Sequence, residues 1–88
     1  MFKGILENGY QITIEPLAPE TKAYAMTKFW MDNGVIWSMT PGFGKFPRPE
    51  IDAEKLGEHV AEMLREGFHV YAEHPNDGEF RIEFKVGG

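Results

Sequence analysis

Acid–base chemistry is the first kind of reaction that the residue types in this chain suggest. His69, Tyr71 and Glu73 alternate along a segment rich in strand-forming residues, so we expect their side chains on one face of a strand. A histidine beside a carboxylate can accept and return a proton. The other histidines, His59 and His74, have spacings that match no metal-binding signature. No segment predicts a pocket at His69, so we expect no catalysis, metal or cofactor. A small enzyme or ligand-binding protein that uses His69 and Glu73 is kept as an alternative.

A run of glutamates at every fourth position is the most unusual charge pattern. Its members are Glu54, Glu58, Glu62 and Glu66. In a helix, residues four apart lie on neighbouring turns, so each like-charged pair costs a few tenths of a kcal/mol. Four residues rise about 6 Å, close to the spacing of successive phosphates along a nucleic-acid strand. The pattern is typical of a solvated helix face, but it also suits a ridge that imitates a phosphate backbone.

The segment Thr40–Glu50 combines prolines and glycines with alternating aromatic and basic residues. These residues are Phe43, Lys45, Phe46 and Arg48. The segment lacks the glycine spacing and the Ser or Thr of a phosphate-binding P-loop. Interleaved aromatic and cationic side chains can stack on the bases of a single strand. We favour instead a loop whose phenylalanines fold back to plug the edge of the core, because the predicted sheet leaves apolar surface uncovered.

Three turn sequences predict where the strands that hold these residues begin and end. They are Glu7-Asn8-Gly9, Asp32-Asn33-Gly34 and Asn76-Asp77-Gly78. Each lies between runs rich in strand formers and predicts a β-hairpin. The apolar pattern favours three-residue loops, because a one-residue slip moves every side chain to the other face. This interpretation makes Phe2–Leu6 a strand and sets Glu73 opposite Arg81.

The second hairpin carries large apolar residues on both faces. A three-residue loop sets Phe29 opposite Trp37 on an inner face, whereas a two-residue loop would pair Trp30 with Trp37. With the three-residue loop, four large side chains share the outer face: Tyr24, Met26, Trp30 and Ile36. Two interpretations stay open. The hairpin is buried on both faces, or this cluster is a patch for self-association or assembly.

Helical periodicity is found in one segment. Its apolar stripe consists of Ala53, Leu56, Gly57, Val60, Met63 and Leu64. Asp52 is the expected N-cap, and Gly67 suits the left-handed position after the last turn. We therefore predict an α+β fold, an antiparallel sheet of about six strands from three hairpins with one amphipathic helix, in the order β-β-β-β-α-β-β. One helix about 10 Å wide cannot cover six strands spaced about 4.8 Å apart, so we expect a homodimer.

Length and composition limit the kinds of protein that this chain can be. The 88 residues fit one domain, 1–88, and they include 14 acidic and 9 basic residues, a net charge of −5 that argues against direct binding of nucleic acid. There is no cysteine, so there is no thiol chemistry. With no signal peptide and no membrane-spanning run, we expect a cytoplasmic protein without a membrane partner. The terminal Gly87-Gly88 resembles the diglycine of ubiquitin-like sulfur carriers and modifiers, but the predicted order of elements departs from that fold.

These observations predict a non-enzymatic, small acidic binding protein. We expect an inhibitor or regulator that uses Glu54–Glu66 to occupy a basic or nucleic-acid-binding surface of another protein. By analogy of size and charge alone, such proteins are expected in phages and mobile elements. The alternative is an assembly subunit that acts through the apolar hairpin patch.

Overall fold

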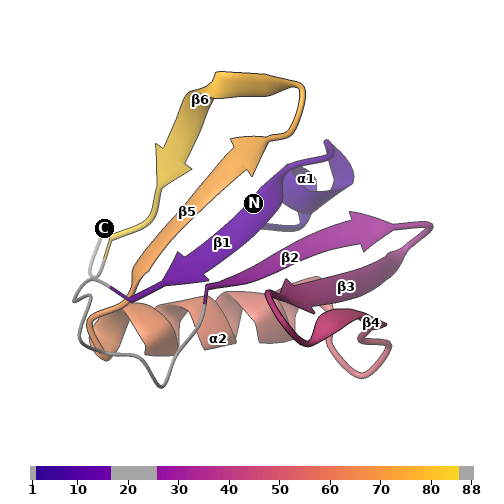
Figure 1. Cartoon of the computed structure of the whole chain (residues 1–88), viewed down its shortest axis with the longest axis horizontal. Helices are drawn as coiled ribbons and strands as arrows, with labels where there is room; N and C mark the ends of the chain where they lie inside the picture. The colour runs from indigo at the N-terminus through magenta and orange to yellow at the C-terminus, as the bar shows by residue number, and fades with distance from the viewer. Residues whose placement is uncertain (1, 17–25, 86–88) are drawn as a thin grey trace.

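The computed structural model describes residues 2–16 and 26–85, and it has an α+β fold (Figure 1). The elements in chain order are α1 (Phe2–Glu7), β1 (Gln11–Glu15), β2 (Thr27–Asp32), β3 (Val35–Thr40), β4 (Gly44–Pro47), α2 (Ala53–Arg65), β5 (His69–His74) and β6 (Asp77–Glu83). The strands form one antiparallel sheet in the order β4-β3-β2-β1-β5-β6. The predicted fold class is confirmed, as is the order of four strands, one main helix and two strands.

The first predicted hairpin is wrong, because Phe2–Glu7 forms the short helix α1 and not a strand. A strand would send the adjacent residues Ile5 and Leu6 to opposite faces, whereas the helix lets both pack on the core. Leu6 is 1% exposed. Gly9, at φ 88°, follows the helix in the left-handed conformation. Strand β1 therefore pairs with β2 and β5 instead of with Phe2–Leu6.

The second hairpin has a two-residue loop, so the favoured three-residue register is wrong. Asp32 pairs with Val35, and Asn33 and Gly34 between them have φ angles of 52° and 78°. Two positive φ values in a two-residue loop define a type I′ turn, whose twist suits the flanking strands. The register shift turns Ile36 toward the core, where it is 2% exposed.

The third hairpin pairs as predicted along its strands but turns earlier. Glu73 lies opposite Arg81, which confirms that prediction. His74 pairs with Asp77, so the turn lies at Pro75-Asn76 and not at Asn76–Gly78. An irregularity between Glu73 and His74 absorbs the difference in length.

Helix α2 begins and ends where the sequence predicts. The backbone N–H of Lys55 donates to Asp52 Oδ1 at 2.8 Å, which makes Asp52 the N-cap. After the last turn, Gly67 has φ 95°, and the N–H of Phe68 donates to the carbonyl of Met63 at 3.0 Å. This is the Schellman arrangement, and it fixes the C-terminal end of the helix.

Both helices cover one face of the sheet. Helix α1 packs against α2 and β2, and α2 packs against β5 (Figure 1). The buried core between helices and sheet consists of Leu6, Ile12, Ile14, Phe29, Ile36, Leu56, Val60, Val70 and Ala72. The opposite face of the sheet, called here the outer face, is covered by neither helix. No helix in residues 2–16 and 26–85 is long and apolar enough to cross a membrane.

Candidate functional site

Four carboxylates form an acidic ridge along α2 and its C-cap. The residues of this acidic ridge are Glu54, Glu58, Glu62 and Glu66. All four are exposed. The opposite side of the helix is anchored in the core by Leu56, which is 0% exposed, and by Val60. With both helix ends capped, the core contacts hold the ridge in place; its residues rise about 18 Å along the helix and wind slowly around it, by about 40° at each step.

The ion pairs of the described residues lie away from the acidic ridge. The three that involve lysine or arginine are Lys3 with Glu7 at 3.7 Å, Arg48 with Glu50 at 3.5 Å and Arg81 with Glu73 at 3.7 Å. On α2 itself, Lys55 turns its ammonium toward the carbonyl of Glu50 at 3.4 Å. Among the described residues, no ion pair therefore offsets the negative charge of the ridge.

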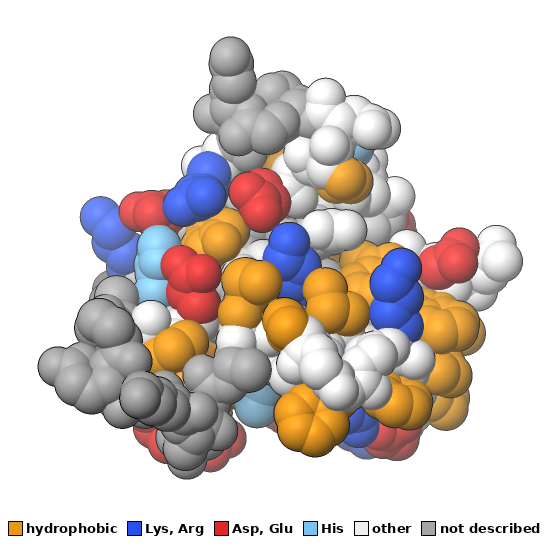
Figure 2. Space-filling view, viewed as in Figure 1, with side chains coloured by type: hydrophobic (Ala, Val, Ile, Leu, Met, Phe, Trp, Pro, Cys, Tyr) orange, Lys and Arg blue, Asp and Glu red, His pale blue; other side chains and the backbone are white. Residues whose placement is uncertain are grey.

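A second surface lies on the outer face, over β2 and β3. Trp30 pairs directly with Trp37 across the two strands, and both rings are partly buried. Val35 and Met39 lie on the same face as Trp37, because residues two apart in a strand share a face. We call Trp30, Val35, Trp37 and Met39 the tryptophan face. Figure 2 shows apolar side chains gathered in this region with basic side chains between them.

The predicted patch of Tyr24, Met26, Trp30 and Ile36 is not a single surface. Ile36 lies on the core side of β3, opposite in direction to Trp30, because the Asn33-Gly34 turn shifts the register by one residue. Met26 is partly buried just before β2, and Tyr24 lies outside the described residues, as does Gly87-Gly88. The patch prediction missed Trp37 for the same reason, although Asn-Gly is a strong signal for a two-residue loop.

The predicted plug formed by residues 40–50 is wrong. Phe43 is 74% exposed and Phe46 is 52% exposed, so neither ring fills the edge of the core. Residues 44–47 instead form the edge strand β4. Its Lys45 places the ammonium 5.9 Å from the centre of the Trp30 ring, over the tryptophan face. Arg48 donates from Nε to Ser38 Oγ at 3.0 Å, which ties the end of β4 to β3.

His69 has carboxylate partners, but they are not the predicted Glu73. Its Nδ1 lies 3.2 Å from Glu15 Oε1 and its Nε2 lies 3.0 Å from Glu83 Oε1, whereas Glu73 pairs with Arg81. The two nitrogens point in opposite directions, so the two carboxylates cannot join the ring around one metal ion. The cluster links β1, β5 and β6 across the outer face.

Tyr71 lies beside this cluster and is almost fully buried. Burial raises the pKa of its hydroxyl above the usual value, and the negative charges of Glu15 and Glu73 raise the pKa further, against the opposing charge of Arg81. The Arg81 guanidinium lies 3.9 Å from the centre of the Tyr71 ring. Tyr71 therefore stays neutral at physiological pH and acts as a packed, hydrogen-bonding group.

The other two histidines take part in ring contacts. The His59 ring lies edge-on to Phe29, with ring centres 6.1 Å apart. The His74 ring lies edge-on to Tyr10 at 5.4 Å, and its Nδ1 accepts a hydrogen bond from the backbone N–H of Asn76 at 3.1 Å. These contacts are those of packing and turn-stabilising side chains.

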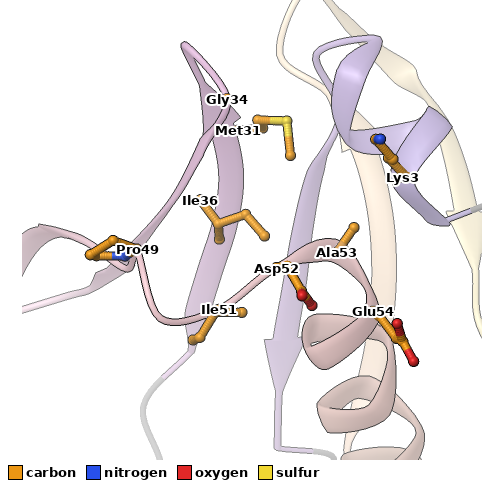
Figure 3. A pocket seen from close by; sticks show the side chains of 9 residues that line it. All are labelled: Lys3, Met31, Gly34, Ile36, Pro49, Ile51, Asp52, Ala53 and Glu54. Atoms are coloured by element: carbon orange, nitrogen blue, oxygen red, sulfur yellow. The ribbon is translucent and has the colours of Figure 1, made fainter.

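Of the cavities on the described part of the molecule, three of the best formed are lined by residues other than His69. One of about 430 Å³ lies between the second hairpin and the start of α2 (Figure 3). Ile36 and Ile51 line it, and Lys3 and Glu54 also border it. Within residues 2–16 and 26–85, no cluster of three His, Cys, Asp or Glu residues could hold a metal ion.

Comparisons with known proteins give no relative for this chain: no family model, no curated protein and no solved structure matches it.

Proposed function

We propose that this protein is a non-enzymatic binding protein that uses the acidic ridge to occupy a basic surface of a partner protein. The observation that carries the proposal is the exposure of all four ridge carboxylates. None of the ion pairs of the described residues includes a residue of the ridge. Like charges on successive turns weaken the helix by a few tenths of a kcal/mol per pair. A local cost of this kind without a local gain favours a role in binding.

The geometry of the ridge suits a surface that binds nucleic acid. Successive carboxylates rise about 6 Å along the helix, and a phosphate backbone presents negative charges at a similar interval. A groove lined by Lys and Arg would attract such a line of charge over a distance set by ionic strength. The protein would then exclude the nucleic acid from its partner, which is the action of an inhibitor or regulator.

The test is capture of partners from an extract of the cells that produce the protein. The immobilised native chain is compared with the double variant Glu58→Lys/Glu62→Lys and with the control Glu7→Lys/Glu50→Lys, which has the same net charge but an intact ridge. We expect basic proteins to be retained by the native chain and the control, and to be lost from the ridge variant. Equal retention by all three chains, or no retention by the native chain, would contradict the proposal.

A further inference from the structure

The tryptophan face has flanking charges of opposite sign. Along β2, Lys28 precedes Trp30 by two residues and Asp32 follows it by two, so all three side chains lie on the outer face. A residue in a strand rises about 3.3 Å, which places Lys28 and Asp32 each roughly 6.6 Å from Trp30 in opposite directions. Asp32 is exposed, while Lys28 and Trp30 are partly buried. A positive and a negative group thus stand at equal distances on either side of an aromatic ring.

We propose that a second copy of this chain covers the tryptophan face, related by a two-fold axis that crosses the strands at the Trp30–Trp37 pair. Such an axis stacks two β2 strands antiparallel and face to face. It sets Lys28 of each copy against Asp32 of the other, and Trp30 against its own counterpart. The arrangement is self-complementary, as a two-fold interface requires.

The same two-fold axis also places strand β3 of one copy antiparallel to strand β3 of the other. Trp37 lies directly opposite Trp30, so the same axis passes near it. Val35 and Met39 flank Trp37 at two residues on either side, and the axis sets Val35 of one copy against Met39 of the other. Val35 of one copy therefore meets Met39 of the other, and four tryptophans gather at the centre, where such residues contribute most to binding. Lys45, whose ammonium lies 5.9 Å from the centre of the Trp30 ring, adds one positive charge per copy beside these rings.

The direction of the axis follows from the charges. An axis parallel to the strands would instead set β2 of one copy over β3 of the other. Lys28 would then lie over Met39 and Asp32 over Val35, and each charge would lose water without gaining a partner. Of the two axes, only the one across the strands pairs Lys28 with Asp32.

The inference does not depend on the role of the acidic ridge. Helix α2 packs on the core side of the sheet, so a dimer formed through the outer face leaves both ridges exposed on opposite sides. The dimer would carry two equivalent acidic ridges, while a monomer would carry one.

The test uses two single charge reversals and their mixture. In Lys28→Glu both flanking groups are acidic, and in Asp32→Lys both are basic, so each variant meets its own copy with like charges. We expect each change to raise the dimer dissociation constant about tenfold or more. When the two variants are mixed, every acidic flank can face a basic one, and we expect a mixed dimer, visible by native mass spectrometry because the two masses differ.

Matched controls separate this interface from a general effect of charge. Glu7→Lys and Lys55→Glu make equal changes of charge on the helical side, and we expect both to dimerise as the native chain does. The double variant Lys28→Glu/Asp32→Lys restores complementarity and should dimerise as well. A monomeric native chain, a dimer unaffected by either reversal, or a mixture that forms no mixed dimer would overturn the proposal. Tryptophan fluorescence and circular dichroism check that each variant is folded.

Discussion

Trp30 and Trp37 lie directly opposite each other on the outer face of β2 and β3, while the neighbouring Ile36 is buried in the core. The Asn33-Gly34 turn causes this arrangement, because its two-residue loop fixes which side of β3 faces the helices. The same turn therefore supplies an apolar side chain to the core and an aromatic pair to the outer surface.

The first prediction concerns this turn. Gly34 has φ 78°, a conformation that costs a residue with a Cβ about 1–2 kcal/mol, so Gly34→Ala should lower the free energy of unfolding by that amount. Gly4 lies inside α1 with open space around it, and Gly4→Ala should raise stability by about 0.5–1 kcal/mol. Urea denaturation compares both variants with the native chain. Equal effects of the two substitutions would show that the type I′ turn is not formed.

The second prediction separates the stability of the acidic ridge from its function. Glu58→Lys replaces two repulsive pairs, with Glu54 and with Glu62, by attractive ones, and it turns the attractive pair with Lys55 into a repulsive one, so the net gain is that of one pair. We expect the free energy of unfolding to rise by about 0.5–1 kcal/mol while partner binding weakens. Thermal denaturation and a binding assay on the same preparation measure the two effects. A variant that is more stable and still binds the partner as tightly as the native chain would contradict the proposed role of the ridge in binding.

The third prediction concerns Tyr71 and alkaline pH. Its folded pKa is raised by burial, so the neutral hydroxyl contributes stability that is present below the unfolded pKa of about 10 and is lost as pH rises through the folded value. Tyr71→Phe has no such proton to lose. Above about pH 10 the native chain should therefore lose stability faster than the variant, as measured by urea denaturation across the pH range. Parallel curves would contradict the burial of this hydroxyl.

The fourth prediction tests the cap that begins α2. Asp52 Oδ1 accepts the N–H of Lys55, and Asp52→Ala should lower the free energy of unfolding by about 1 kcal/mol. Asp52→Asn keeps an accepting oxygen and should cost less. A loss equal in both variants would mean that charge, and not the hydrogen bond, is what Asp52 supplies.

Sequence patterns predicted the elements with strong local signals. The periodicity of α2, its two caps and the pairing of Glu73 with Arg81 are all confirmed. The first hairpin failed because an Asn-Gly pair serves equally as a hairpin turn and as a helix end, and Gly9 ends α1. Strand β4 was not predicted, because Pro47 argues against a strand. An edge strand tolerates proline, since one of its sides forms no hydrogen bonds to a neighbouring strand.

Some residues of the candidate surfaces could be predicted from the sequence, and others could not. Exposure of the acidic ridge follows from helical periodicity, so its four glutamates could be found from the sequence. The partners of His69 could not, because Glu15 lies 54 residues away and meets it only through the pairing of β1 with β5. The flanking pair of Lys28 and Asp32 became visible only once the register of β2 and β3 was known.

The central claim is that the acidic ridge occupies a basic, nucleic-acid-binding surface, and a competition measurement tests it most directly. The affinity of the captured partner for the native chain is measured over a range of ionic strength, with and without double-stranded DNA. We predict that affinity falls steeply with added salt and that DNA displaces the protein from its partner. An affinity that changes little with salt and is unaffected by DNA would contradict the claim.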